Sequence, residues 1–228
     1  MIRVMSRSVL ISVCILLFSA TSLMAQNKKT MYTYLALGDS YTIGEQVPSE
    51  DNFPHQLVKM LNDKGFSVAQ PKIIAVTGWT TDELAAAIKA ENITETYSFV
   101  TLLIGVNNQY RGRTVDNYKE EYTQLLEQAI GFAGGDPNKV FVLSIPDWGV
   151  TPFAEGRDRQ QIARDIDAYN AAKEEITKDH KCHWLEITQS TREHGIDESY
   201  LVADKLHYSG KEYRLWAERL VEIFAKEF

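Results

Sequence analysis

The chain has 228 residues, of which 24 are basic and 31 acidic, so its formal net charge at pH 7 is −7. An acidic protein repels the phosphate backbone of DNA and RNA, which argues against a nucleic-acid-binding function. The length suits an N-terminal leader followed by one domain that is large enough to bury a substantial hydrophobic core.

The start of the chain has the pattern of a secretory signal peptide. Arg3 and Arg7 make the first residues basic, an apolar run extends from Val9 to Leu17, and small residues precede Ala25. We expect cleavage after Ala25, with Ala20 as the alternative site. The apolar run is shorter than the roughly 20 residues that a membrane-spanning helix needs, which argues against a membrane anchor.

We therefore expect a signal peptide at residues 1–25 and a single domain at residues 26–228. Cleavage leaves an exported protein, in a bacterial periplasm or secreted, without a stable membrane span. The domain keeps one cysteine, Cys182, so an internal disulfide is not expected. Because Cys182 opens an apolar run, we interpret it as a buried strand residue rather than as a catalytic thiol.

Short apolar runs alternate with longer segments of helical periodicity along the domain. Most of the runs are continuously apolar, which is typical of parallel strands that are covered on both faces. The predicted strands are Met31–Leu37, Lys72–Val76, Phe99–Ile104, Val140–Ile145 and Cys182–Ile187. The predicted helices are Pro54–Lys64, Thr80–Ala90, Val115–Ile130, Arg157–Lys178 and a last helix that begins near Ser209.

Two of these helices begin with the pattern of a capping box, at Thr80–Glu83 and at Ser209–Glu212. The alternation of strand and helix predicts right-handed crossovers and an α/β fold. We expect a three-layer α/β/α sandwich around a central, mostly parallel five-stranded sheet.

Polar and glycine-rich segments follow four of the predicted strands. In an open parallel sheet, functional groups gather beyond the carboxyl ends of the strands. The segments are Gly38-Asp39-Ser40-Tyr41, Thr77-Gly78-Trp79, Gly105-Val106-Asn107-Asn108 and, after a longer loop, Asp204-Lys205-Leu206-His207. We expect these four segments to meet at one edge of the sheet.

Together these segments can supply what ester hydrolysis needs. Ser40 can act as the nucleophile, His207 as the base, and Asp204, three residues before His207, can orient the imidazole. The backbone N–H groups of Ser40 and Gly78 and the side-chain amide of Asn107 can donate hydrogen bonds to the oxyanion. The sequence therefore predicts a Ser-His-Asp triad with an oxyanion hole.

In these segments the chain resembles the GDSL, or SGNH, hydrolase family. That family has a serine in Gly-Asp-Ser, a glycine, an asparagine in Gly-x-Asn-Asp and a histidine in Asp-x-x-His. Ser40, Gly78, Asn107 and His207 match these positions in order, and Asp204 completes the triad. The resemblance covers nearly the whole domain and implies a flavodoxin-like arrangement and hydrolysis of carboxylic esters by acyl transfer.

Two positions depart from the family pattern. Tyr41 replaces a leucine, and Asn108 replaces the aspartate that follows the oxyanion asparagine. We predict that Tyr41, Trp79, Asn108 and Trp148 contact the substrate, the two tryptophans by lining an acyl or sugar pocket. A packing role is the alternative for both tryptophans.

The sequence thus predicts an exported serine esterase that acts on a small-molecule, lipid or acylated-glycan ester. It leaves open a lysophospholipase, a thioesterase and a short-chain acyl esterase. The alternatives are a carbohydrate O-deacetylase and a non-catalytic ligand-binding relative. Neither a metal nor another cofactor is expected, and a monomer is favoured. Arg111 and Arg113 are interpreted as solvated loop charges, with binding of a substrate anion as the alternative.

Overall fold

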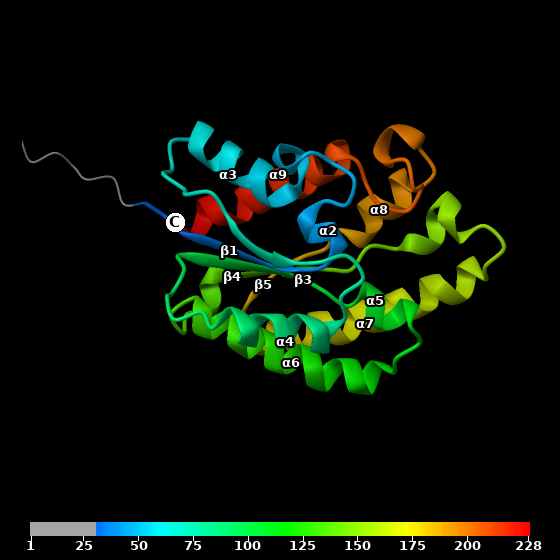
Figure 1. Cartoon of the computed structure of the whole chain (residues 1–228), viewed down its shortest axis with the longest axis horizontal. Helices are drawn as coiled ribbons and strands as arrows, with labels where there is room; N and C mark the ends of the chain where they lie inside the picture. The colour runs from blue at the N-terminus through cyan, green and yellow to red at the C-terminus, as the bar shows by residue number, and fades with distance from the viewer. Residues whose placement is uncertain (1–30) are drawn as a thin grey trace, which may run out of the picture. The chain divides into compact units, whose positions relative to one another are not determined.

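The apolar runs pair side by side in one sheet (Figure 1). A computed structural model describes residues 31–228, so the predicted signal peptide lies outside the described residues. The strands are β1 (Tyr34–Gly38), β2 (Lys72–Ala75), β3 (Phe99–Leu103), β4 (Val140–Leu143) and β5 (His183–Leu185). Their order is β2-β1-β3-β4-β5 and every neighbouring pair is parallel, which confirms the predicted five-stranded sheet.

The strands are shorter than predicted because the chain leaves the hydrogen-bond ladder at their carboxyl ends. Ile145, for example, follows β4, and its N–H donates to Asn170 Oδ1 at 2.8 Å while its carbonyl accepts from Asn170 Nδ2 at 3.2 Å. At the start of the sheet, Tyr32 forms only an isolated bridge with Val68. At Ile145 a side chain therefore replaces the strand neighbour.

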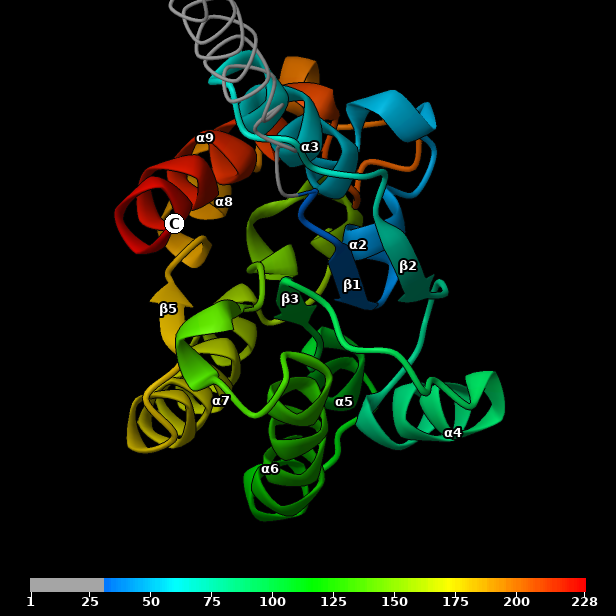
Figure 2. The same ribbon diagram turned by 90° about the vertical axis from the view of Figure 1, so that its left-hand side faces the viewer.

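Helices cover both faces of the sheet, as the alternating pattern predicts (Figures 1 and 2). One face carries α2 (Ser40–Ile43), α3 (Phe53–Asp63), α8 (Thr188–His194) and α9 (Gly210–Glu227). The other carries α4 (Thr81–Glu91), α5 (Val106–Tyr110), α6 (Val115–Phe132) and α7 (Arg159–Asp179). The three-layer sandwich is confirmed.

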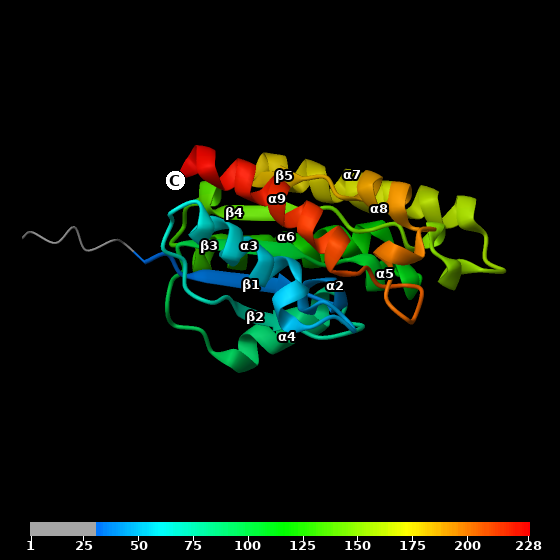
Figure 3. The same cartoon turned by 90° about the horizontal axis from the view of Figure 1, so that it is seen from above.

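Three short α-helices within residues 31–228 were not predicted, and all three lie at the same end of the sheet. Figures 1 and 3 show α2, α5 and α8 near the carboxyl ends of the strands, while α3 and α9 lie side by side over one face. Each short helix has only one or two turns, too few for the 3.6-residue periodicity to be seen in the sequence. They shape the loops in which the polar segments lie.

The core lies on both faces of the three inner strands. Every residue of β1, β3 and β4 is buried, in agreement with their continuously apolar sequences. The Tyr34 and Phe99 rings stack with centroids 4.3 Å apart, and Phe224 of α9 packs against Phe99 at 4.9 Å. The edge strands β2 and β5 are only partly buried.

The two predicted capping boxes have different outcomes. The first is confirmed, since Thr80 precedes α4 and its N–H donates to Glu83 Oε2 at 2.9 Å. The second is wrong, because the Ser209 hydroxyl donates to the Ser199 carbonyl and the Glu212 side chain points into the core.

Glu212 instead joins α9 to α8. Its carboxylate accepts hydrogen bonds from Ser190 Oγ at 2.6 Å and from Trp216 Nε1 at 2.8 Å, and it lies 2.7 Å from His194 Nδ1. These side chains satisfy the hydrogen-bonding needs of the fully buried Glu212 carboxylate. The carboxylate therefore does not cap the backbone at the start of α9. Among residues 31–228, no helix is long and apolar enough to cross a membrane.

The role of Glu212 gives a prediction about stability. Glu212→Ala leaves the Ser190 and Trp216 donors without their acceptor, and each unsatisfied buried group costs about 1–3 kcal/mol. We expect the free energy of unfolding, measured by urea denaturation, to fall by about 2–4 kcal/mol. Ser209→Ala is the control and should cost less than about 0.5 kcal/mol. Equal losses in the two variants would support the capping box instead.

Candidate active site

Ser40 lies on a tight turn between β1 and α2. Asp39 is the N-cap of α2, and its carboxylate accepts the Tyr41 N–H at 3.0 Å. The turn brings Gly38 so close to β3 that a Cβ atom there would lie 2.4 Å from the Leu103 carbonyl oxygen. Glycine is therefore required at this strand end, and Ser40 follows as the first residue of the helix.

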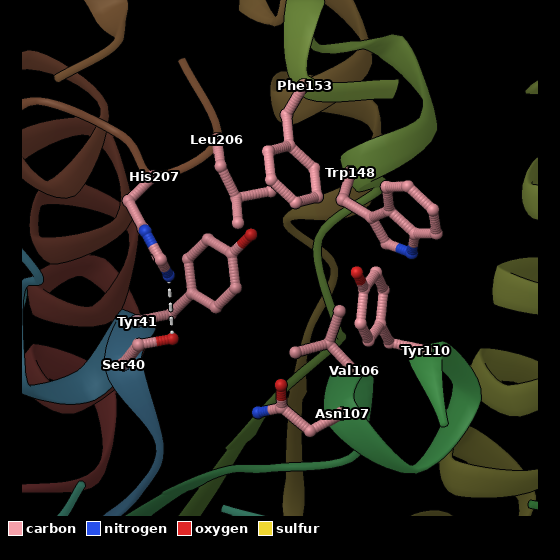
Figure 4. Close-up of a pocket in the computed structure, with 9 residues that line it drawn as sticks. All are labelled: Ser40, Tyr41, Val106, Asn107, Tyr110, Trp148, Phe153, Leu206 and His207. Atoms are coloured by element: carbon pink, nitrogen blue, oxygen red, sulfur yellow. Dashed lines mark hydrogen bonds between the residues drawn. The ribbon is translucent and has the colours of Figure 1, made fainter. Parts of the chain in front are cut away.

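The loop before α9 brings His207 to Ser40. His207 Nε2 lies 2.8 Å from Ser40 Oγ, and His207 Nδ1 lies 2.7 Å from Asp204 Oδ2 (Figure 4). The other carboxylate oxygen, Oδ1, accepts the N–H groups of Leu206 at 2.8 Å and His207 at 2.9 Å. One carboxylate thus fixes both the imidazole ring and the backbone that carries it.

These contacts keep Asp204 ionised beside a buried imidazole. Burial raises the pKa of Asp204, but hydrogen bonds from the His207 ring and from the His207 and Leu206 N–H groups outweigh it and leave the pKa lowered. The His207 ring is held from another side by Tyr41, whose ring centroid is 5.0 Å away. His207 can accept the Ser40 proton, and the Asp204 carboxylate can stabilise the imidazolium that results.

Two backbone N–H groups and one side-chain amide are the candidate oxyanion donors. The N–H groups of Ser40 and Gly78 have no acceptor within residues 31–228. Asn107, from α5, donates through Nδ2 to the Trp79 carbonyl at 3.0 Å, with Asp39 Oδ2 at 3.5 Å. Gly78 has φ +84°, a left-handed conformation that favours glycine.

A half-open cavity of about 160 Å³ lies directly against Ser40 and His207. Across it stand three rings, Tyr110, Trp148 and Phe153, which we call the aromatic wall (Figure 4). Trp148 is buried, and its centroid lies 5.2 Å from that of Tyr110 and 6.2 Å from that of Phe153. The full lining is Ser40, Tyr41, Val106, Asn107, Tyr110, Trp148, Phe153, Leu206 and His207.

Two of the four residues that were predicted to contact the substrate line the cavity. Tyr41 and Trp148 line the cavity, whereas Trp79 and Asn108 do not. Trp79 is partly buried and packs against the core. Asn108 is fully buried, accepts the Thr81 N–H at 3.1 Å and donates to Thr81 Oγ1 at 2.6 Å. The prediction of substrate contact is therefore wrong for Asn108, which holds the start of α4.

Most of the apolar residues that line the cavity were not predicted from the sequence. Tyr110 and Phe153 are exposed side chains in the segments that follow β3 and β4. Functional groups gather beyond the carboxyl ends of parallel strands, which is how Asn107 was predicted. The same reasoning applies to these two rings and could have identified them as candidate substrate contacts. Val106 and Leu206, which neighbour Asn107 and His207 in sequence, also line the cavity.

Two arginines after α5 are ion-paired rather than freely solvated. Arg113 Nη1 donates to Asp82 Oδ1 at 2.6 Å and lies 3.4 Å from Glu121 Oε2. Arg111 Nη1 donates to Glu83 Oε1 at 3.1 Å. The interpretation of both as solvated loop charges is corrected.

A buried lysine lies at the carboxyl ends of β3 and β4. Lys173 of α7 is fully buried, and its Nζ donates to the Leu143 carbonyl at 2.7 Å and the Ile104 carbonyl at 3.0 Å. Burial lowers the pKa of Lys173 to about 7, although the charge of Asp39 opposes this. Burial likewise raises the pKa of Asp39 to about 7, against the effect of the Tyr41 N–H and Lys173. The Lys173 side-chain nitrogen thus ties together the ends of β3 and β4.

Comparisons with known proteins agree with this fold. A model of the GDSL-like Lipase/Acylhydrolase family matches residues 36–215. The esterase EstA from Pseudoalteromonas sp. is 15% identical, with a TM-score of 0.66, covering 86% of this chain and 97% of its own. A lipase/acylhydrolase from Enterococcus faecalis is 22% identical, with a TM-score of 0.66, covering 84% and 94%.

A third similar structure is an acetyl xylan esterase, 16% identical with a TM-score of 0.65, covering 83% of this chain and 98% of its own. At these identities the structural likeness shows the fold alone. The comparison with curated proteins found no match. In residues 31–228, no cluster of His, Cys, Asp and Glu side chains is arranged to hold a metal ion.

Lys173 gives a prediction about pH. Its pKa falls from 10.5 in the unfolded chain to about 7 in the folded one, so the unfolded chain binds more protons between these values and the Lys173 contribution to stability rises with pH there. In Lys173→Met this contribution is absent, and the pKa of Asp39 rises further. We expect the stability difference, wild type minus variant, to increase between about pH 7 and 9.

The measurement is urea denaturation at several pH values. Lys178→Met, which removes an exposed lysine from the same helix, is the control and should give a curve parallel to that of the wild type. A Lys173→Met curve that also runs parallel would contradict the prediction.

Proposed function

The chain belongs to the GDSL-like lipase/acylhydrolase family, and we propose that Ser40, His207 and Asp204 form the catalytic triad of this serine ester hydrolase. The observation that carries the proposal is the continuous hydrogen-bonded row from Asp204 through His207 to Ser40, at the wall of an apolar cavity. A non-catalytic relative would have no need for an ionised carboxylate, a buried imidazole and a serine in this arrangement.

The first step is acylation of the serine. His207 Nε2 takes the Ser40 proton as Oγ attacks the ester carbonyl, and Asp204 stabilises the imidazolium that forms. The negative charge that develops on the carbonyl oxygen is bound by the N–H groups of Ser40 and Gly78 and by the Asn107 amide. His207 then protonates the leaving alcohol, and the acyl group stays on Ser40.

Deacylation repeats these roles with water as the nucleophile. His207 takes a proton from water as the water oxygen attacks the acyl carbonyl, and the same donors bind the oxyanion. The proton returns to Ser40 as the carboxylic acid leaves. The residues that carry both steps come from four separate segments, at Ser40, Gly78, Asn107 and Asp204–His207.

The cavity favours a short acyl group among the possibilities that the sequence left open. Its volume is about 160 Å³, and an apolar cavity of about 150 Å³ holds one benzene molecule. An acyl group of about six carbons fills such a space. A lysophospholipid acyl chain is longer and would have to extend past the aromatic wall. We therefore favour a short-chain acyl esterase over a lysophospholipase.

Exposed rings at the cavity support a carbohydrate O-deacetylase as the second candidate. Tyr110 is 47% and Phe153 42% exposed, so both present apolar surface to a substrate beyond the acyl group. Aromatic faces of this kind can cover the apolar face of a sugar ring. One similar fold is that of an acetyl xylan esterase. An acetyl group is within the size limit of the cavity.

We also propose that the enzyme works outside the cytoplasm after removal of residues 1–25. The support is the sequence pattern of basic start, apolar run and small residues before Ala25.

The triad proposal is tested by Ser40→Ala. We expect kcat/KM for p-nitrophenyl butyrate to fall by about 10⁴-fold or more, because the nucleophile is lost. Thermal unfolding and circular dichroism should remain those of the wild type. A fluorophosphonate should label Ser40 of the wild type, as located by mass spectrometry. The control is Ser49→Ala, at an exposed serine, and activity retained in Ser40→Ala would refute the triad.

The acyl-size proposal is tested with p-nitrophenyl esters of two to twelve carbons. Wild-type kcat/KM should fall beyond about six carbons. In Trp148→Ala, removal of a ring from the aromatic wall should raise the decanoate-to-butyrate ratio of kcat/KM roughly tenfold. Trp79→Ala is the matched control, because Trp79 does not line the cavity.

Two results would change the assignment. Unchanged length profiles in Trp148→Ala would contradict the acyl pocket. Faster hydrolysis of acetylated xylo-oligosaccharides than of every short nitrophenyl ester would favour the second candidate.

A further inference from the structure

Two side chains at α5 hold two consecutive carbonyl groups of the loop between β2 and α4. Asn107 Nδ2 donates to the Trp79 carbonyl at 3.0 Å, and Arg111 Nη2 donates to the Gly78 carbonyl at 2.6 Å. Asn107 and Arg111 are four residues apart, so they lie on the same side of one helical turn. The segment that supplies one oxyanion donor therefore also contacts the residue that supplies another.

The Arg111 guanidinium is itself oriented by a second contact. Nη1 donates to Glu83 Oε1 at 3.1 Å, and Glu83 Oε2 accepts the Thr80 N–H at 2.9 Å. The planar, forked guanidinium thus bridges the Gly78 carbonyl and the first turn of α4. Arg111 is about half exposed, with 44% of its side-chain surface accessible, so the contact is made at the surface and adds little to the core.

Gly78 needs such a contact because its own backbone is free to turn. Its φ is +84°, in the left-handed region. Glycine adopts positive and negative φ about equally readily, so its backbone is less restrained than that of other residues. Within residues 31–228, the bond from Arg111 is the one hydrogen bond that the Gly78 backbone makes. An oxyanion donor must lie within a few tenths of an ångström of its position to stabilise the transition state.

We propose that Arg111 is a positioning residue: it anchors the Gly78 carbonyl, and with it the Gly78–Trp79 peptide, which limits rotation about the backbone bonds of Gly78 and so keeps the Gly78 N–H aligned for the oxyanion. The inference rests on the proposed function, since it assigns Gly78 as a donor. Arg111 acts through Gly78 and Asn107 acts directly, so one short segment sets the relative position of two of the three donors.

Direct binding of a substrate anion by Arg111 fits the geometry less well. Arg111 does not line the cavity. Its two terminal nitrogens are already bonded to Glu83 and Gly78. An arginine that bound substrate would change KM on removal, whereas one that aligns a transition-state donor changes kcat.

The experiment compares Arg111→Met with Arg113→Met, a matched control. Both variants remove an arginine that pairs with acidic residues of α4, but only Arg111 contacts Gly78. In Arg111→Met we expect kcat for p-nitrophenyl butyrate to fall about 10- to 100-fold, with KM within about twofold of wild type. The rate of fluorophosphonate labelling at Ser40 should fall by a similar factor. Arg113→Met should leave both rates near those of the wild type.

The outcomes separate this inference from the proposed function. Wild-type labelling at Ser40 together with an unchanged kcat in Arg111→Met would overturn the positioning role and leave the triad intact. A change in KM alone would overturn it in favour of substrate binding. Equal losses of kcat in Arg111→Met and Arg113→Met, accompanied by equal losses of thermal stability, would also overturn it, because the effect would then be structural.

Discussion

The site depends on how buried backbone groups are hydrogen-bonded at the carboxyl ends of the parallel strands. Beyond the last rung of the ladder, carbonyl groups are still buried but have no strand partner, and leaving them unsatisfied is costly. Lys173 donates to the carbonyls of Ile104 and Leu143, and Asn170 bonds both backbone groups of Ile145. Both side chains come from α7. This helix therefore holds the points at which the loops leave β3 and β4. The loop after β3 carries Asn107 and Tyr110, and the loop after β4 carries Trp148 and Phe153.

The fold and the reacting groups could be predicted because both depend on local sequence. Continuous apolar runs such as Phe99–Ile104 indicate covered parallel strands, and polar residues after them fall at one edge of the sheet. Asp204 and His207 are three residues apart, so their contact is formed within one turn. The location of Ser40 at the edge of the sheet followed from the prediction of the strand that precedes it. The order of these segments along the chain then determined the family resemblance, which the family match confirms.

The rest could not be predicted because it depends on partners far apart in sequence. Lys173 and Glu212 look like exposed residues of amphipathic helices, yet both are fully buried. Each is satisfied by groups that only the tertiary fold brings near, such as Ser190 and Trp216 for Glu212. The Ser209–Glu212 spacing fits a capping box, but the Glu212 carboxylate instead forms hydrogen bonds with side chains in the core. Helical periodicity records which side of a helix is apolar and cannot identify a paired charge on that side.

Asn108 shows how a departure from the family pattern can follow from hydrogen-bond direction. Its Oδ1 accepts the Thr81 N–H and its Nδ2 donates to Thr81 Oγ1, while the Thr81 hydroxyl donates to Glu121. An ionised aspartate in this position can only accept. The single Thr81 proton would then face two carboxylates, and a further negative charge would lie near Glu121. The amide both donates and accepts, so asparagine fits this network and keeps α4 attached to the segment that carries Asn107.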